Sequence, residues 1–329
     1  MKGGLEKRIE ETGQKTGIAF GGRGRTPAGE GLLCISLATM PWSAHHASTN
    51  DCTVLMGIGH DSTQLYLDET RRVQAQLNRQ EQALMKFKAG SLTEWDETGI
   101  RCERVKCSKP CTLCTAPCSG YRLQWNRWIM GVVRGDRTTM IVHQLPWKTS
   151  EAGGAGVPLS DDECDSYCLP HMGKRVINLT DGASPYEAFA GGQIRCSPDC
   201  DRKDCKARAL KKGRSECNGM RPRMGRDRYK NLYKSLELSH GIVTHSKEEW
   251  AMIKEVRVWG PVGSKIVKLK HGTQVADGAW AELKQAVPNM VHSSDHERIA
   301  DYVHAWVWCA RRHGADLFTA LGEAVAARR

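Results

Sequence analysis

The segment 128-WIMGVVRGDRTTMIVHQL-145 constrains the fold more than any other part of the chain. Two runs rich in apolar and β-branched residues surround 134-RGDR-137, a pattern that predicts a β-hairpin. The segment 92–100, before the hairpin, and the apolar run at 174–181 predict further strands, and helical periodicity follows at 274–287. A hairpin, further strands and then helices predict a mixed α/β domain, whose catalytic residues we expect at strand ends.

Net charge and the distribution of apolar residues narrow the class of protein. The 329 residues carry 48 Lys and Arg against 37 Asp and Glu, a net charge of +11, which favours a polyanionic partner, nucleic acid first. A merely basic soluble protein has the same composition. No apolar run approaches the ~18 residues of a membrane helix, and the N-terminus is too polar for a secretory signal. We therefore expect an intracellular protein, nuclear in a eukaryote and otherwise cytoplasmic, without a membrane partner.

The N-terminal third differs from the rest. Residues 1–30 are predicted to form a disordered basic arm. Residues 31–90 are predicted to be helical, with a long helix after a Gly-containing turn near residue 57. Two helices joined by such a turn, with Arg71 and Arg72 on the second, are typical of a DNA-binding helix-turn-helix. A helical hairpin that only packs on the next domain explains the pattern equally well.

The remaining chain is predicted to form one α/β domain at 91–290. Two Cys-rich, basic segments at about 101–120 and 192–228 interrupt it, and we expect them to be insertions in loops. Residues 291–329 are predicted to form C-terminal helices that pack on this domain. The acidic run 161-DDECD-165 is predicted to be a solvated cluster in a loop.

Three aspartates occupy positions suited to chemistry. Asp96 lies in the strand predicted at 92–100, Asp181 ends the strand at 174–181, and Asp277 lies on the helix at 274–287. Taken alone, Asp181 next to Gly182 is typical of an ordinary turn. Asp277 lies beside an apolar helical stripe, so we expect its carboxylate at the edge of the core and not in solvent. Glu97, by strand alternation, points to the opposite face from Asp96.

Three carboxylates that converge from two strands and a helix suit two-metal phosphoryl transfer. Two Mg²⁺ or Mn²⁺ ions about 3.5–4 Å apart need shared and terminal oxygen ligands. Neither a Walker-type loop nor an H-E-x-x-H or G-x-S-x-G motif occurs, so ATP use, zinc proteolysis and α/β-hydrolase chemistry lack motif support.

The motifs around these acids occur in a fixed order. They are Asp96-Glu97-Thr98, Thr180-Asp181-Gly182 with Tyr186, 240-HGIVTHS-246, and Thr273-Gln274 followed by Asp277, Trp280, Leu283 and Lys284. In this order they resemble the DDE-type transposases of the insertion-sequence group that is related to the eukaryotic Merlin elements. The resemblance covers about residues 91 to 290. This chain departs from the family in having aspartate at Asp277, where the family usually has glutamate, and Gln274, where it usually has asparagine.

The resemblance implies a ribonuclease H-like mixed sheet flanked by helices, with Asp96, Asp181 and Asp277 as ligands of two metal ions. His245, Gln274 and Lys284 would be supporting residues near the DNA. It further implies strand cleavage and strand transfer on double-stranded DNA, at element ends and target, by a homo-oligomer bound to DNA. A catalytically inactive DNA-binding descendant and a nuclease of the same fold are the alternatives.

The cysteines form two sets that could each close a tetrahedral zinc site, although neither is a pair of C-x-x-C knuckles. The first set is Cys107, Cys111, Cys114 and Cys118, and the second is Cys196, Cys200, Cys205 and Cys217. Cys164, Cys168 and His171 are candidates for additional ligands. Reduced cysteines without a metal in variable loops are the alternative interpretation for each set.

Overall fold

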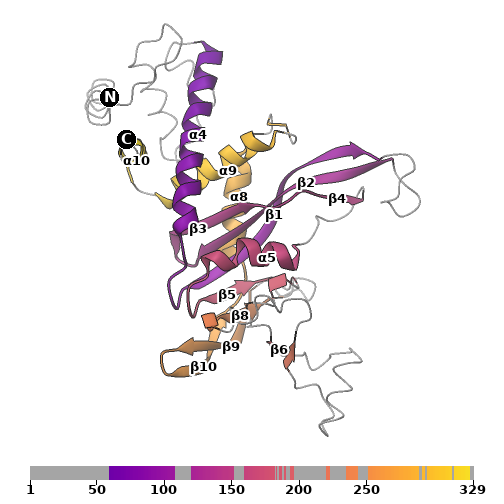
Figure 1. The fold of residues 1–329 in the computed structure, drawn as a ribbon, viewed down its shortest axis with the longest axis vertical. Helices are drawn as coiled ribbons and strands as arrows, with labels where there is room; N and C mark the ends of the chain where they lie inside the picture. The colour runs from indigo at the N-terminus through magenta and orange to yellow at the C-terminus, as the bar shows by residue number, and fades with distance from the viewer. Residues whose placement is uncertain are drawn as a thin grey trace. The chain divides into compact units, whose positions relative to one another are not determined.

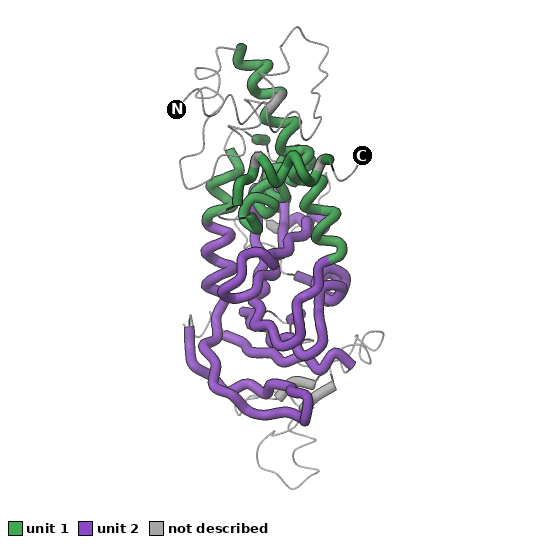
Figure 2. Tube along the Cα trace, turned by 90° about the vertical axis from the view of Figure 1, so that its left-hand side faces the viewer, with its two compact units in different colours: residues 1–84, 282–329 green, residues 85–281 purple. Residues whose placement is uncertain are grey.

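The structure is a computed structural model. It describes residues 59–107, 120–151, 159–181, 183, 185–186, 189, 193–195, 220–222, 235–243, 251–288, 291–292, 295–312 and 315–326. Two compact units divide the chain, one formed by residues 1–84 with 282–329 and the other by residues 85–281 (Figure 2). The boundary between the units falls within the helix α8 (Gln274–Ala286).

The larger unit is built on a six-stranded mixed sheet with the strand order β3-β2-β1-β5-β8 (Figure 1). Antiparallel pairing joins β1 (Leu92–Lys106) to β2 (Tyr121–Val133), and β2 to β3 (Asp136–Gln144). Parallel pairing joins β1 to β5 (Ile177–Thr180), and β5 to β8 (Ser239–Ile242). The predicted mixed α/β fold is thereby confirmed. The sheet continues on β2, which also pairs with β4 (Lys148–Glu151).

The remaining strands of the described residues form two small antiparallel sheets. β9 (Ile253–Gly260) and β10 (Gly263–Lys270) form a two-stranded ribbon, and β6 (Gln193–Arg195) pairs with β7 (Met220–Pro222). The larger unit also contains α5 (Asp161–Tyr167), the 3-10 helix η1 (Leu169–His171) and the first part of α8.

The smaller unit is helical in its described residues. The long helix predicted after residue 57 is α4 (His60–Leu84), and the predicted C-terminal helices are α9 (His296–Arg311) and α10 (Leu317–Ala326). Within this unit α4 packs along α9, where the buried Asn78 and His304 side chains are 2.8 Å apart (Nδ2 to Nδ1). Arg71, a candidate DNA contact, forms an ion pair with Asp68 at 2.6 Å and lies over the Tyr302 ring. The first helix of the predicted helix-turn-helix lies outside the described residues, as does the basic arm.

The first Cys-rich segment differs from the expected loop insertion. Strands β1 and β2 remain paired from Arg101 with Asn126 to Lys106 with Tyr121, so residues 101–106 belong to the sheet. The Cys107 N–H donates to the Gly120 carbonyl at 3.1 Å and closes the hairpin. Alternating exposure along 101–106 gives the segment a strand pattern that its many polar residues obscured.

One face of the sheet carries the hydrophobic core of the larger unit. Trp95 of β1 is fully buried there and packs edge-on against Phe87, with ring centroids 5.6 Å apart. The same cluster contains Cys164 and Cys168 from the α5 region, so α5 covers this face (Figure 1). Neighbouring residues of a strand point to opposite faces, so Glu94 and Asp96 face away from this core.

We expect Gly131→Ala to lower the free energy of unfolding by about 1–3 kcal/mol, the usual cost of overpacking a core. Gly131 pairs with Trp95, and an added Cβ would lie 2.7 Å from the ring of that fully buried indole. Chemical denaturation measures the change. Gly278→Ala is the control, because a Cβ there meets nothing within 4 Å and alanine favours the helix by roughly 0.5–1 kcal/mol. Equal effects of the two substitutions would contradict this account.

Candidate active site

Parallel pairing of β1 with β5 places two of the three predicted acids side by side. The register pairs Glu94 with Leu179 and Trp95 with Thr180. The next residue on each chain is Asp96 and Asp181, respectively. Because parallel neighbours in register lie about 4.8 Å apart, the two aspartates are brought together from positions 85 residues apart in the sequence.

The third acid is brought to the same face by a contact that sequence reasoning missed. The Glu94 side chain is fully buried, and its Oε2 accepts hydrogen bonds from the backbone N–H groups of Val275 at 2.7 Å and Ala276 at 3.1 Å. These N–H groups belong to the first turn of α8, which has no intrahelical acceptor for them. A carboxylate at this position also favours the positive end of the helix dipole. Glu94 therefore caps the helix that carries Asp277.

Arg134, in the turn between β2 and β3, completes this contact. Its Nε donates to Glu94 Oε1 at 2.6 Å, and its Nη1 and Nη2 donate to the carbonyl oxygens of Lys270 at 2.5 Å and Gly272 at 3.0 Å. One guanidinium therefore neutralises the buried carboxylate and fixes the backbone that leads into α8. We call Glu94 and Arg134 the helix clamp. The sequence signal for it is weak, because Glu94 is one of several charged residues in β1 and lies two positions before Asp96.

Asp96 is close enough to the other two aspartates for their charges to influence it. Burial raises the pKa of Asp96 well above its usual value, and the negative charges of Glu97, Asp277 and Asp181 raise it further. On the opposite face of β1, Glu97 accepts a hydrogen bond from the Tyr186 hydroxyl at 2.5 Å. Burial raises the pKa of Glu97 as well, while the Tyr186 hydrogen bond opposes that rise. The Asp96-Glu97 motif is thus in direct contact with the tyrosine that follows Asp181.

Backbone and side-chain hydrogen bonds hold the segment around Asp181. Its Oδ1 accepts from the Ala183 N–H at 3.0 Å, an arrangement typical of an Asx turn. The Thr180 hydroxyl donates to the Asp181 carbonyl at 2.8 Å and lies 2.9 Å from Nε2 of His240. Burial lowers the pKa of His240 to about 3, so its imidazole is neutral and can donate from Nε2 to Thr180. His240, from the 240–246 motif, supports the Asp181 turn.

Asp277 lies on the exposed face of α8, and the expectation that its carboxylate would sit at the edge of the core is wrong. Ala276, Ala279 and Leu283 form the buried stripe as predicted, but Asp277 lies outside it. The Thr273 hydroxyl donates to Asp277 Oδ2 at 3.2 Å. The predicted supporting residues Gln274 and Lys284 are exposed on the same helix. An exposed carboxylate remains accessible to a ligand.

The donor atoms of the site suit a hard cation, since Asp96, Asp181 and Asp277 offer only carboxylate oxygens. Among the residues that the structure describes, however, no three His, Cys, Asp or Glu side chains are arranged to hold a metal ion. His245 lies outside the described residues. So do all the predicted zinc ligands except Cys107, which is half-buried at the end of β1.

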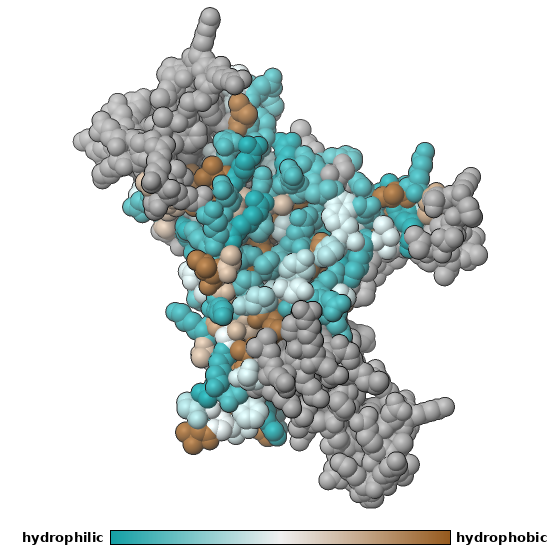
Figure 3. Space-filling model, viewed as in Figure 1, coloured by the Kyte–Doolittle hydropathy of each residue, from teal (hydrophilic) through white to brown (hydrophobic). Residues whose placement is uncertain are grey.

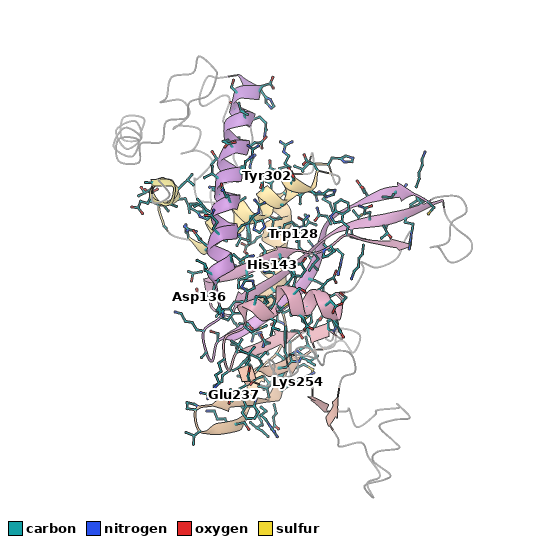
Figure 4. The ribbon with its side chains drawn as sticks, viewed as in Figure 1. Trp128, Asp136, His143, Glu237, Lys254 and Tyr302 are labelled. Carbon is teal, nitrogen blue, oxygen red and sulfur yellow. The ribbon has the colours of Figure 1, made fainter. Side chains whose placement is uncertain are left out.

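Within the described part of the chain, the candidates for additional zinc ligands, Cys164, Cys168 and His171, do not come together as a metal site. Cys164 and Cys168 are fully buried in the core cluster. His171 Nδ1 donates to the Met85 carbonyl at 2.8 Å, and its Nε2 lies 2.7 Å from Nε2 of His143. Burial, with His171 as a secondary cause, lowers the pKa of His143 to about 3. The His143 imidazole is therefore neutral and hydrogen-bonded to that of His171; His143 is labelled in Figure 4.

The acidic run 161–165 is a helix and not the predicted loop. Ser160 caps α5 in a reciprocal capping box with Glu163, a pattern visible in the sequence as Ser-x-x-Glu. Glu163, Cys164 and Asp165 are buried. Arg127 binds both Glu163 oxygens, at 2.7 and 3.2 Å, and Lys148 donates to Oε2 at 2.8 Å. Partners far away in the sequence therefore neutralise a charge that was expected to be solvated.

Comparisons with known proteins identify no relative of this chain. Within the described part of the chain, no helix combines the length and the apolar character needed to cross a membrane. No protein-family model, curated protein or solved structure matches the chain.

Proposed function

We propose that this chain is a DDE-type transposase that cleaves DNA at element ends and joins the freed 3′-hydroxyl to target DNA. The observation that carries the proposal is the convergence of Asp96 and Asp181, through the β1–β5 register, with Asp277 on the capped helix α8. The strand order, three antiparallel strands followed by two parallel ones beside β1, is compatible with a ribonuclease H-like sheet.

Asp96, Asp181 and Asp277 would hold the Mg²⁺ or Mn²⁺ ions, because these cations prefer oxygen ligands. When bound, the ions would activate water or a 3′-hydroxyl and stabilise the leaving oxygen. The chain itself supplies the positioning. The helix clamp fixes the first turn of α8, and Thr180 with His240 fixes the Asp181 turn.

The other parts of the proposal concern partners. Gln274 and Lys284, exposed on α8, would contact double-stranded DNA near the scissile bond. The net charge of +11 supports a polyanionic substrate. A homo-oligomer would assemble on the DNA ends, and any zinc bound by the Cys-rich segments would be structural.

The decisive experiment measures cleavage of linear double-stranded DNA with Mg²⁺ or Mn²⁺, and with a chelator as blank. We expect Asp181→Asn to lose more activity than the roughly 10- to 100-fold caused by loss of an outer-shell partner. Asp61→Asn, the same chemical change at an exposed residue of α4, is expected to retain wild-type activity. Equal cleavage by wild type and Asp181→Asn would refute the catalytic assignment. Cleavage without strand transfer would favour the nuclease.

A catalytically inactive DNA-binding protein is the second candidate. The lack of a metal-holding group among the described residues favours it, as does aspartate in place of the longer glutamate at Asp277. Positioning errors near 1 Å reduce rates by about 100-fold. Asp277→Glu therefore discriminates between the candidates. DNA binding without cleavage, unchanged in Asp277→Glu, would support the inactive protein, whereas cleavage that Asp277→Asn abolishes would support the transposase.

A further inference from the structure

The ribbon formed by β9 and β10 has one face that is exposed along its whole length. The register pairs Ile253 with Lys270, Glu255 with Lys268, Arg257 with Ile266 and Trp259 with Ser264. Paired residues point to the same face, and all eight are exposed. We call these eight residues the outer face of the ribbon. The opposite face carries Val256, which is buried.

The outer face combines positive charge with apolar side chains. Arg257, Lys268 and Lys270 stand against the single acid Glu255, so three cations and one acid leave a net charge of +2. Between them Ile253 is 73% exposed, Ile266 59% and Trp259 36%. Figure 3 shows hydrophobic and hydrophilic surface next to each other over this part of the molecule.

This combination is complementary to duplex DNA. Lysine and arginine bind phosphate oxygens, while apolar side chains contact base edges such as the thymine methyl group. The major groove of B-DNA is wide enough to admit a two-stranded β-ribbon. Lys268 and Lys270 are two residues apart and therefore about 7 Å apart along β10, so the positive charge is distributed along the ribbon.

The base of the ribbon is fixed to β8, the neighbour of β5, and to Arg134 of the helix clamp. Lys254, labelled on β9 in Figure 4, donates to the Ile242 carbonyl of β8 at 3.1 Å. The His271 N–H donates to the Met252 carbonyl at 2.7 Å. Arg134 of the helix clamp binds the carbonyls of Lys270 and Gly272, just before α8. The ribbon and the three aspartates belong to the same unit.

We propose that the outer face of the β9–β10 ribbon is a contact surface for the double-stranded DNA that is presented to Asp96, Asp181 and Asp277. The proposal rests on the proposed function for the identity of the partner. It assigns phosphate contacts to Arg257, Lys268 and Lys270, and contacts with sugars or base edges to Trp259 and Ile266.

The test measures binding of a fluorescent 30-base-pair duplex by anisotropy, in a chelator so that no cleavage occurs, over a series of salt concentrations. The variant Arg257→Ala/Lys268→Ala/Lys270→Ala is expected to bind at least about tenfold more weakly. Its slope of log K against log[salt] is expected to be lower in magnitude by about 2–3, since each phosphate contact contributes about 0.9. The control Lys86→Ala/Lys88→Ala/Lys106→Ala removes the same charge from exposed positions outside the ribbon.

Equal losses in the two triple variants would overturn the inference, because net charge alone would then account for binding. An unchanged salt slope in the ribbon variant would also overturn it. If Trp259→Ala/Ile266→Ser changes the mass of the protein in light scattering but not its DNA binding, the face is a protein interface instead. The ribbon inference stands if wild type binds through the ribbon but never cleaves, and only the proposed function then fails. If the protein cleaves DNA but binds it independently of the ribbon, the proposed function stands and the ribbon inference fails.

Discussion

Glu94→Gln is expected to lower the free energy of unfolding by about 3 kcal/mol and to slow DNA cleavage by about 100-fold. Glu94 is fully buried, and glutamine would leave Arg134 without a charged partner. Breaking a buried ion pair from one side costs about 3–5 kcal/mol, and the partly exposed Arg134 places this pair at the lower end. Loosening the first turn of α8 displaces Asp277, and displacements near 1 Å cost about 100-fold in rate.

Chemical denaturation and cleavage assays well below the melting temperature separate the two effects of Glu94→Gln. A residue that only stabilises the fold would leave the rate per folded molecule and its Mg²⁺ dependence unchanged. A positioning residue would raise the Mg²⁺ concentration needed for half-maximal cleavage. Glu323→Gln, the same change at an exposed position of α10, is the control. A double-mutant cycle with Arg134→Met gives the coupling energy of the helix clamp. A loss of stability below 1 kcal/mol would show that the clamp does not hold α8.

Glu163→Gln is the second substitution with a large expected effect, a loss of about 3–5 kcal/mol of unfolding free energy. The Glu163 carboxylate and the Arg127 guanidinium are both buried and form a bidentate pair. Removing the negative charge leaves Arg127 buried without its neutralising partner, while Lys148 is partly exposed and regains water. Asp162→Asn, on the exposed side of the same helical turn, is the control and is expected to change stability by less than about 0.5 kcal/mol.

The same pair predicts how stability depends on pH. Hydrogen bonds from Arg127, Lys148 and the Ser160 N–H outweigh the effect of burial and lower the pKa of Glu163 from 4.5 to about 2. Between pH 4.5 and 2 the unfolded chain binds a proton that the folded chain does not. The contribution of Glu163 is therefore complete above about pH 5 and is lost as pH falls towards 2, about 3 kcal/mol in all. Glu163→Gln should lack this part of the acid dependence, and parallel pH profiles for wild type and variant would contradict the prediction.

The amino-acid sequence by itself determined the elements that carry or precede the three aspartates, the hairpin beside them, and the order of the motifs. The hairpin at 128–145, the strands at Asp96 and before Asp181, and the helix that begins at Gln274 all follow from local patterns of apolar residues. Periodicity and turn residues carry such information because strands and helices repeat their exposure every 2.0 and 3.6 residues. The function, the DNA partner and the metal ions stay predictions that rest on those motifs.

Only the tertiary structure decided which charged residues are partners. By sequence, Glu94 is one of several acids in the strand predicted at 92–100, and Glu163 is part of a solvated acidic run. Glu94 is buried because Arg134 and backbone N–H groups of α8, both distant in the sequence, reach it. Glu163 is buried because the distant Arg127 binds it, while the nearby Ser160 N–H also donates to it. Asp277, which the helical pattern placed at the edge of the core, is exposed instead. Burial of a charge depends on pairing with groups elsewhere in the fold, and the pattern of neighbouring residues does not predict that pairing.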